Sequence, residues 1–301
     1  MNTKLTMISL AIGGGLLIAS CKESSAPGAE ASPSDQSTAA ADPATQAHIL
    51  YQNEPSLPVG AINTKTEVMS MTDARMTMTV QGREVSGTMS RTGEKIKTLT
   101  VDSDKQLTIA IIKDENSGGG VIDGKPLPES KETEVLHGKT IVLTKKDGTW
   151  SAQLKEGTPD PATQKAMDKM TRHMNQPDDR IIFGSGPRKV GDTWEVDPSQ
   201  LQSFAGADSD KLSVSFKVTF ESIKNLDGHD CAVIVSEIDI KGKTDQGMDI
   251  RMVGKVTVFQ SLEFHTGLRF LMDGKIIMDG PNSMHLEGPM KIDGKATLKL
   301  P

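Results

Sequence analysis

The sequence predicts a mainly β protein in which long antiparallel strands form a curved sheet or open half-barrel, with one main α-helix packed on it. Apolar and polar residues alternate over long stretches of the chain, which is typical of strands with one buried face. One stretch, near residues 160–175, has the period of an amphipathic helix instead. The dipeptide Asp-Gly favours tight hairpin turns because it tolerates positive φ. It occurs six times, with its aspartates at positions 123, 147, 227, 273, 279 and 293.

The N-terminus predicts a signal peptide over residues 1–20. Lys4 supplies a positive charge, and the apolar run of residues 7–18 is too short to span the ~30 Å hydrocarbon core of a membrane comfortably. The run ends in Ile18-Ala19-Ser20-Cys21. This resembles the lipobox of bacterial lipoproteins, which has an aliphatic residue, two small residues and then an obligatory cysteine. The alternative is an ordinary secretory signal followed by a chance cysteine.

The lipobox resemblance implies a lipid anchor at Cys21. In that family the cysteine thiol receives a diacylglyceryl group, the chain is cleaved before it, and the new amine is acylated, for example with palmitate. Several acyl chains together anchor a protein stably. Lys22 follows, where an Asp retains lipoproteins at the inner membrane of well-studied bacteria. The resemblance therefore implies a protein anchored in the outer membrane and facing the periplasm.

Residues 21–58 predict a flexible tether between that anchor and the folded body. They are rich in Ala, Ser, Pro and Gln and have few large apolar residues, so burial cannot offset the entropy of ordering them. Within them, Ile49-Leu50-Tyr51 is apolar enough to dock locally. Residues 59–301 are expected to form a single β-rich domain.

The longest alternating pattern runs from Met248 to Phe264. It exceeds the usual length of a strand, so we expect this strand to curve or bend, with Gly254 as a natural place.

The helix near residues 160–175 has a recognisable start and one apolar face. Asp160 or Thr158 can cap it, and Pro161 suits its first turn. A shorter helix is expected after Pro198. The apolar face of the main helix carries Met167, Met170 and Met174.

Two further resemblances bear on the body of the protein. The segment Val190-Gly191-Asp192-Thr193-Trp194 resembles the "VGDTW" element of uncharacterised bacterial lipoproteins that share a lipobox, a tether and a β-rich body. The succession of long strands and a helix is similar to the lipoprotein-localisation-factor (Lol) and mycobacterial lipid-carrier superfamily. That resemblance implies an open half-barrel whose concave face binds acyl chains, but it identifies no ligand residue.

Composition and motifs exclude several classes of function. The chain has 34 Lys+Arg against 40 Asp+Glu and shows no basic cluster, which argues against nucleic acid as a partner. It contains no Gly-X-Ser-X-Gly, His-Glu-X-X-His or Cys-X-X-Cys, so we expect neither an enzyme nor a cofactor. Cys231 lies in an apolar, strand-like run and is expected to be a buried, unreactive thiol.

Methionine is the unusual residue type, with 16 in the chain. Thioethers can fill an aromatic-poor core or line an adaptable apolar groove, and they are also ligands for Cu(I). The candidate ligand-binding residues are therefore the methionines of two strand-like runs, those of the helix, and one tryptophan: Met69, Met71, Met76, Met78, Met167, Met170, Met174 and Trp194.

Together these features predict a lipid-anchored protein that binds an apolar ligand, such as a lipid or acyl chain, on a concave face lined by Met, Val and Ile. The helix near residues 160–175 would be a movable cover. One alternative is a structural or interaction module that contacts another envelope protein. A second alternative is a copper-binding protein that uses the methionine pairs.

Overall fold

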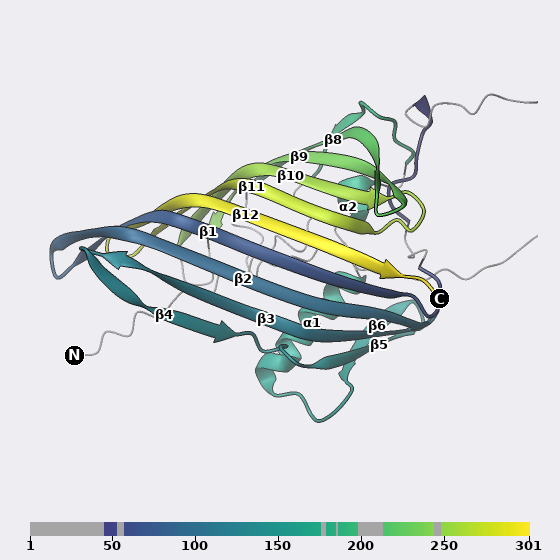
Figure 1. The fold of residues 1–301 in the computed structure, drawn as a ribbon, viewed down its shortest axis with the longest axis horizontal. Helices are drawn as coiled ribbons and strands as arrows, with labels where there is room; N and C mark the ends of the chain where they lie inside the picture. The colour runs from purple at the N-terminus through teal and green to yellow at the C-terminus, as the bar shows by residue number, and fades with distance from the viewer. Residues whose placement is uncertain (1–44, 53–56, 176–178, 185, 198–212, 244–247) are drawn as a thin grey trace, which may run out of the picture.

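The computed structural model describes residues 45–52, 57–175, 179–184, 186–197, 213–243 and 248–301. Within them, twelve strands form one antiparallel sheet and two helices pack against it (Figure 1). The predicted mainly β fold with one main helix is confirmed. In chain order the elements are β1 (Ile62–Val80), β2 (Arg83–Ser103), β3 (Gln106–Ile122), β4 (Lys125–Thr133), β5 (Thr140–Lys146), β6 (Thr149–Leu154), α1 (Pro161–Asn175), α2 (Asp179–Phe183), β7 (Thr193–Glu195), β8 (Ser213–Leu226), β9 (His229–Lys243), β10 (Asp249–Ser261), β11 (Gly267–Gly280) and β12 (Met284–Lys299).

The strands follow the order β6-β5-β3-β2-β1-β12-β11-β10-β9-β8-β7, and β4 pairs with β3 off this path. Most neighbours in the sheet are also neighbours in sequence, but β1 pairs with β12 and so joins the two halves of the domain. The path ends at β6 and β7, and the sheet curves around both helices without closing, as Figure 1 shows. This is the open half-barrel that the sequence predicts.

Three of the six Asp-Gly dipeptides form tight turns. Asp123, Asp147 and Asp227 have φ values of 49°, 52° and 53°, and each precedes a glycine of positive φ. Two of the others, at Asp273 and Asp293, lie inside β11 and β12, so a turn prediction is wrong at these positions. There the alternation of the strand places the charged aspartate on the outer face and the glycine on the inner face.

Glycine is required where β10 and β11 cross the middle of the sheet. Gly254 lies opposite Gly274, and a Cβ atom on Gly254 would lie only 2.6 Å from the carbonyl oxygen of Asp273. The close approach explains the glycine in the strand predicted around it. β10 ends at Ser261 rather than at Phe264, because the chain turns through His265, whose φ is 47°.

Helix α1 occupies the predicted position and is fixed at both ends. The backbone N–H of Thr163 donates to Oδ1 of Asp160 at 2.7 Å, which confirms Asp160 as the cap and lowers the pKa of its carboxyl group. At the other end, the side chain of Asn175 accepts from the N–H of Trp150 at 2.8 Å and donates to the carbonyl of Trp150 at 3.1 Å. These bonds join α1 to β6, at one end of the sheet.

The interior contains two main hydrophobic clusters. One lies under α1, where Met167 and Met174 pack with side chains of β2, β3, β5 and β6 such as Ile141 and Trp150. The other lies on the inner face of β1 and β8 to β12, where Ile182 of α2 is buried. Each helix therefore belongs to a different half of the sheet.

The segment at residues 45–52, which its sequence predicts to belong to the tether, packs onto the second of these halves. Leu50 is fully buried, and its carbonyl accepts from Nε2 of Gln260 at 3.2 Å. The backbones of His48 and Arg188 exchange two hydrogen bonds, of 2.7 and 2.8 Å. The signal peptide, Cys21 and the short helix expected after Pro198 lie outside the described residues.

Candidate ligand-binding cavity

The long strands separate an apolar inner face from a charged outer face. On β12, Leu286, Met290 and Ile292 point inward and are buried, whereas Lys291 and Asp293 point outward and are exposed. The inner face is the one against which both helices pack. The same alternation continues across β11 and β10 because the three strands are in register.

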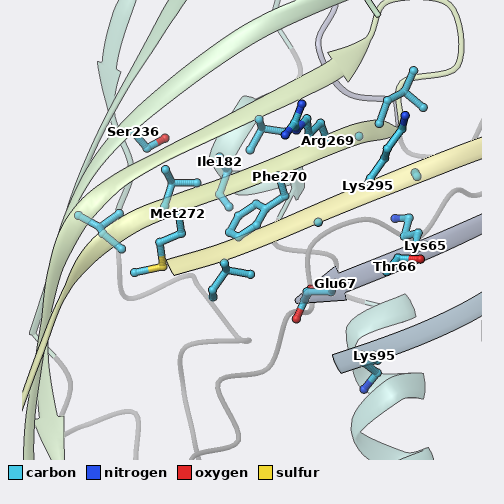
Figure 2. A pocket seen from close by; sticks show the side chains of 18 of the residues that line it. Lys65, Thr66, Glu67, Lys95, Ile182, Ser236, Arg269, Phe270, Met272 and Lys295 are labelled. Atoms are coloured by element: carbon cyan, nitrogen blue, oxygen red, sulfur yellow. The ribbon is translucent and has the colours of Figure 1, made fainter. Parts of the chain in front are cut away.

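A cavity, called here the inner hollow, lies on this face between α2 and the strands β8 to β12 and β1. The cavity volume is about 80 Å³, and the wider concavity around it opens to solvent. Figure 2 shows Ile182 of α2 together with Phe270 and Met272 of β11 around this space. The apolar residues that line it are Ile182, Phe183, Phe216, Ile238, Met252, Val256, Val258, Leu268, Phe270, Met272, Ile292 and Ala296.

Part of the space exists because one residue of the wall lacks a side chain. Gly294 of β12 lies on the inner face, opposite Phe270 on one side and Glu67 on the other. A Cβ atom at Gly294 would meet Phe270 Cβ at 3.5 Å, an ordinary van der Waals distance. A longer side chain at this position would therefore extend into the inner hollow without a backbone clash.

Helix α2 forms the wall opposite the sheet, and Trp194 of β7 holds it in place. Nε1 of Trp194 donates to the carbonyl of Ile182 at 2.8 Å. The guanidinium of Arg188 lies over the Trp194 ring, 4.4 Å from its centroid, in a cation–π arrangement. In contrast to α1, this helix has five residues, so contacts of this kind rather than its own hydrogen bonds hold it in place.

Charged side chains border the inner hollow on β1 and β2, and we call Lys65, Glu67, Lys95 and Lys97 the polar margin. The register places Lys65 directly opposite Lys97, and Glu67 directly opposite Lys95. Lys95 also forms a salt bridge of 2.9 Å with Asp114 of β3. Three of these residues, Lys65, Glu67 and Lys95, are labelled in Figure 2.

Burial lowers the pKa of both Lys65 and Lys97, because an apolar environment disfavours the charged amine. The charge of Lys97 lowers the pKa of Lys65 further, and that of Lys95 does the same for Lys97. Negative charge on Glu67 acts in the opposite direction on both lysines. The polar margin thus contains two neighbouring amines whose pKa values are both lowered.

The strand methionines predicted as ligand contacts lie beside the inner hollow rather than along its wall. Met76 is buried in the cluster of β1 and β8 to β12, and Met69, Met71 and Met78 pack partly buried against it. Among the described residues, none of these four lines the inner hollow.

The other predicted contacts have structural surroundings as well. Met167 and Met174 are buried under α1 and Met170 packs against the same cluster, so α1 covers a filled core and the structure places α2 over the inner hollow instead. Trp194 acts through its hydrogen bond to α2 and does not line the inner hollow itself.

The residues that do line the inner hollow gave a weaker signal in the sequence. All seven Phe lie after residue 180, and three of them, Phe183, Phe216 and Phe270, face the inner hollow. The polar margin could not be predicted from the sequence, because Lys65 and Lys97 become neighbours only through the register of β1 and β2.

The described residues contain no group of three or more His, Cys, Asp or Glu side chains that could hold a metal ion. Cys231 is buried, and burial raises the pKa of its thiol to about 11, so it is unreactive as predicted. No helix among the described residues is long and apolar enough to cross a membrane.

No known protein-family profile matches the sequence, and no curated protein matches it. Solved structures with a similar arrangement include lipovitellin, from a study of lipid–protein interactions, with a TM-score of 0.41 and 8% identity over 81% of this chain. The chain spans 26% of the length of that protein. The outer membrane protein OprG from Pseudomonas aeruginosa matches 81% of this chain and 98% of its own, with a TM-score of 0.20 and 11% identity.

Proposed function

We propose that this protein binds an apolar ligand, a lipid or an acyl chain, in the inner hollow without catalysing a reaction. The observation that carries the proposal is the hollow itself: an apolar space on the inner face of the sheet, bounded by α2. Water gains few hydrogen bonds in such a space, whereas each methylene group that enters contributes about 0.8 kcal/mol. A chain of several methylenes would therefore bind through burial alone.

In this proposal the movable cover is α2 rather than the main helix. Ile182 and Phe183 are the parts of α2 that face the inner hollow, and Trp194 limits how far the helix can shift. α1 is unsuited to the role because its buried methionines and its bonds to Trp150 fix it to β6.

We further propose that the protein is lipid-anchored at Cys21 in the bacterial cell envelope and faces the periplasm from the outer membrane. The support is the N-terminal sequence, in which a charged start, an apolar run and Ile18-Ala19-Ser20-Cys21 follow one another. A membrane anchor would keep the inner hollow close to a source of lipid.

Native mass spectrometry of the purified full chain, followed by solvent extraction, tests the binding function. We expect adduct masses that the extract resolves into lipids, and uptake of a fluorescent fatty-acid probe after delipidation. A bare polypeptide mass with no uptake of the probe would contradict the proposal and favour the alternative, an interaction module of the envelope.

A matched pair of variants at one position tests the location of the site. In Gly294→Leu the new side chain occupies the inner hollow beside Phe270, so we expect at least tenfold weaker binding of the probe. In Gly294→Ala only a Cβ atom is added at an ordinary contact distance, and binding should stay near that of the wild type. Equal binding by both folded variants would place the ligand elsewhere.

A further inference from the structure

The pairing of β1 with β2 contains one contact between like charges on the inner face. Lys65 and Lys97 lie directly opposite each other in the register, and both are partly buried. Like charges in directly opposed positions destabilise a sheet. The protein therefore maintains this pair against an electrostatic cost.

Several lysines elsewhere in the sheet bind carboxylates. In the next row of the same two strands, Lys95 lies opposite Glu67 and binds Asp114 at 2.9 Å. On the outer face, Lys113 binds Glu94 at 2.7 Å and Lys291 binds Asp273 at 3.4 Å. Like charges also lie directly opposite each other where Arg251 faces Lys241 and where Arg269 faces Lys295, and in both cases the arginine binds an aspartate on the outer face. The pair of Lys65 and Lys97 lies on the inner face instead, where it borders the inner hollow.

The remaining cross-strand neighbours of the two lysines are apolar. Lys97 lies opposite Ile111 of β3, and Lys65 lies opposite Ala296 of β12. Negative charge reaches the pair from Glu67, from Asp114, which is already bound to Lys95, and from Asp179 at the start of α2. An additional anion would lower the repulsion between the two amines and favour their charged form.

The lysine pair also lines the same cavity as the apolar wall. Lys65 and Lys97 border the inner hollow together with Leu268 and Phe270. A ligand with its chain among these apolar side chains can therefore place its polar end at the two amines.

We propose that Lys65 and Lys97 form a subsite for the anionic head group, a carboxylate or a phosphate, of an amphiphile whose chain occupies the inner hollow. This rests on the proposed function, because the subsite serves only a ligand that already binds there. Two amines can hold the two oxygens of one anionic group through charge-assisted hydrogen bonds, which are stronger than neutral ones.

The test compares three ligands that each have twelve carbon atoms in one saturated chain and differ in the head group: dodecanoate, dodecyl phosphate and 1-dodecanol. Each is titrated into the delipidated full chain below the concentration at which it forms micelles or separates from solution. We expect both the alcohol and the anions to bind, with at least one anion at least tenfold tighter than the alcohol. The anion that binds more tightly identifies the head group.

The double variant Lys65→Gln/Lys97→Gln should lose this preference while its affinity for 1-dodecanol stays unchanged. The matched control, Lys291→Gln/Lys299→Gln, removes the same charge from two exposed positions on β12 and should keep the preference. A thermal unfolding curve verifies that each variant is folded.

The outcomes separate the two proposals. Equal binding of all three ligands to the wild type would overturn the head-group subsite and leave the apolar site in place, and this result needs no variant. Loss of the preference in the control as well would also overturn it, since general charge would then be the cause. Binding of none of the three ligands would overturn the proposed function and the subsite together.

Discussion

The two halves of the sheet enclose their helices in different ways. Under α1, the side chains of β2, β3, β5 and β6 fill the space around Met167 and leave a closed core. Under α2, the side chains of β8 to β12 leave the inner hollow. α1 has 15 residues and is capped and clamped, whereas α2 has five and depends on Trp194. One half therefore has a filled core, and the other leaves the space that we propose as the binding site.

The largest effect that separates the halves should come from Met167→Ala. Met167 is 1% exposed, so its truncation leaves a cavity and should lower the free energy of unfolding by about 2–5 kcal/mol. The affinity for 1-dodecanol should not change, because no residue of α1 lines the inner hollow. Urea unfolding and ligand titration measure the two quantities. Met170→Ala, at a partly buried position of the same helix, should cost less, and a loss of affinity in Met167→Ala would refute the division between the halves.

Changing the pH tests the polar margin within the second half. Because the pKa values of Lys65 and Lys97 are lowered, raising the pH removes their protons earlier than those of exposed lysines. The affinity for dodecanoate should therefore fall as the pH rises through the lowered pKa values, by up to about tenfold, or 1.4 kcal/mol. The charged groups that act on the pair are Glu67, Lys95, Asp114 and Asp179.

Titration of 1-dodecanol over the same range is the control for this pH effect. Its affinity should stay constant, because a neutral head group gains nothing from a protonated amine. A parallel fall for both ligands would point to a general loosening of the fold and would contradict the role of the lysines.

The hydrogen bond that holds α2 can be removed with Trp194→Phe. Loss of the bond from Nε1 to the carbonyl of Ile182 should cost about 1 kcal/mol and make α2 open more often. We expect faster hydrogen exchange in α2 and faster release of the ligand. Asp160→Ala removes the cap of α1 at a similar cost of about 1 kcal/mol and should leave the release rate as it was. Equal release rates in the two variants would show that α2 is not the cover.

The smallest expected effect is a gain in stability. Lys97→Met removes the like-charge contact with Lys65 and should raise the free energy of unfolding by about 0.2–1 kcal/mol, measured by urea unfolding. Lys95→Met is the control in the neighbouring row, where the substitution breaks the salt bridge to Asp114 and should give no gain. A loss of stability in Lys97→Met would show that the lysine pair is structural.

Much of the architecture could be read from local patterns. The alternation in residues 249–261, the turn at Asp123-Gly124 and the cap at Asp160 depend on neighbouring residues only, and the structure has them where the sequence predicts them. The same reasoning failed at Asp273 and Asp293, because an Asp-Gly dipeptide fits both a turn and a strand whose aspartate faces outward.

The residues that line the inner hollow were harder to predict than the fold. The methionines at positions 69, 71, 76 and 78 were rightly placed on strands, but whether a strand residue lines a cavity depends on what packs against it. Those of α1 proved to be core for the same reason. Gly294, which opens the wall, looks in the sequence like one more turn glycine.

The sequence by itself therefore determined the fold class, the main helix and the presence of long alternating strands, because backbone preferences and the alternation of side chains act over a few residues. Only the tertiary structure decided that β1 joins β12, that α2 rather than α1 borders the inner hollow, and that Lys65 faces Lys97. These features bring together residues far apart in the chain, or set the register between strands. Both are fixed by the packing of the whole sheet, which no local pattern contains.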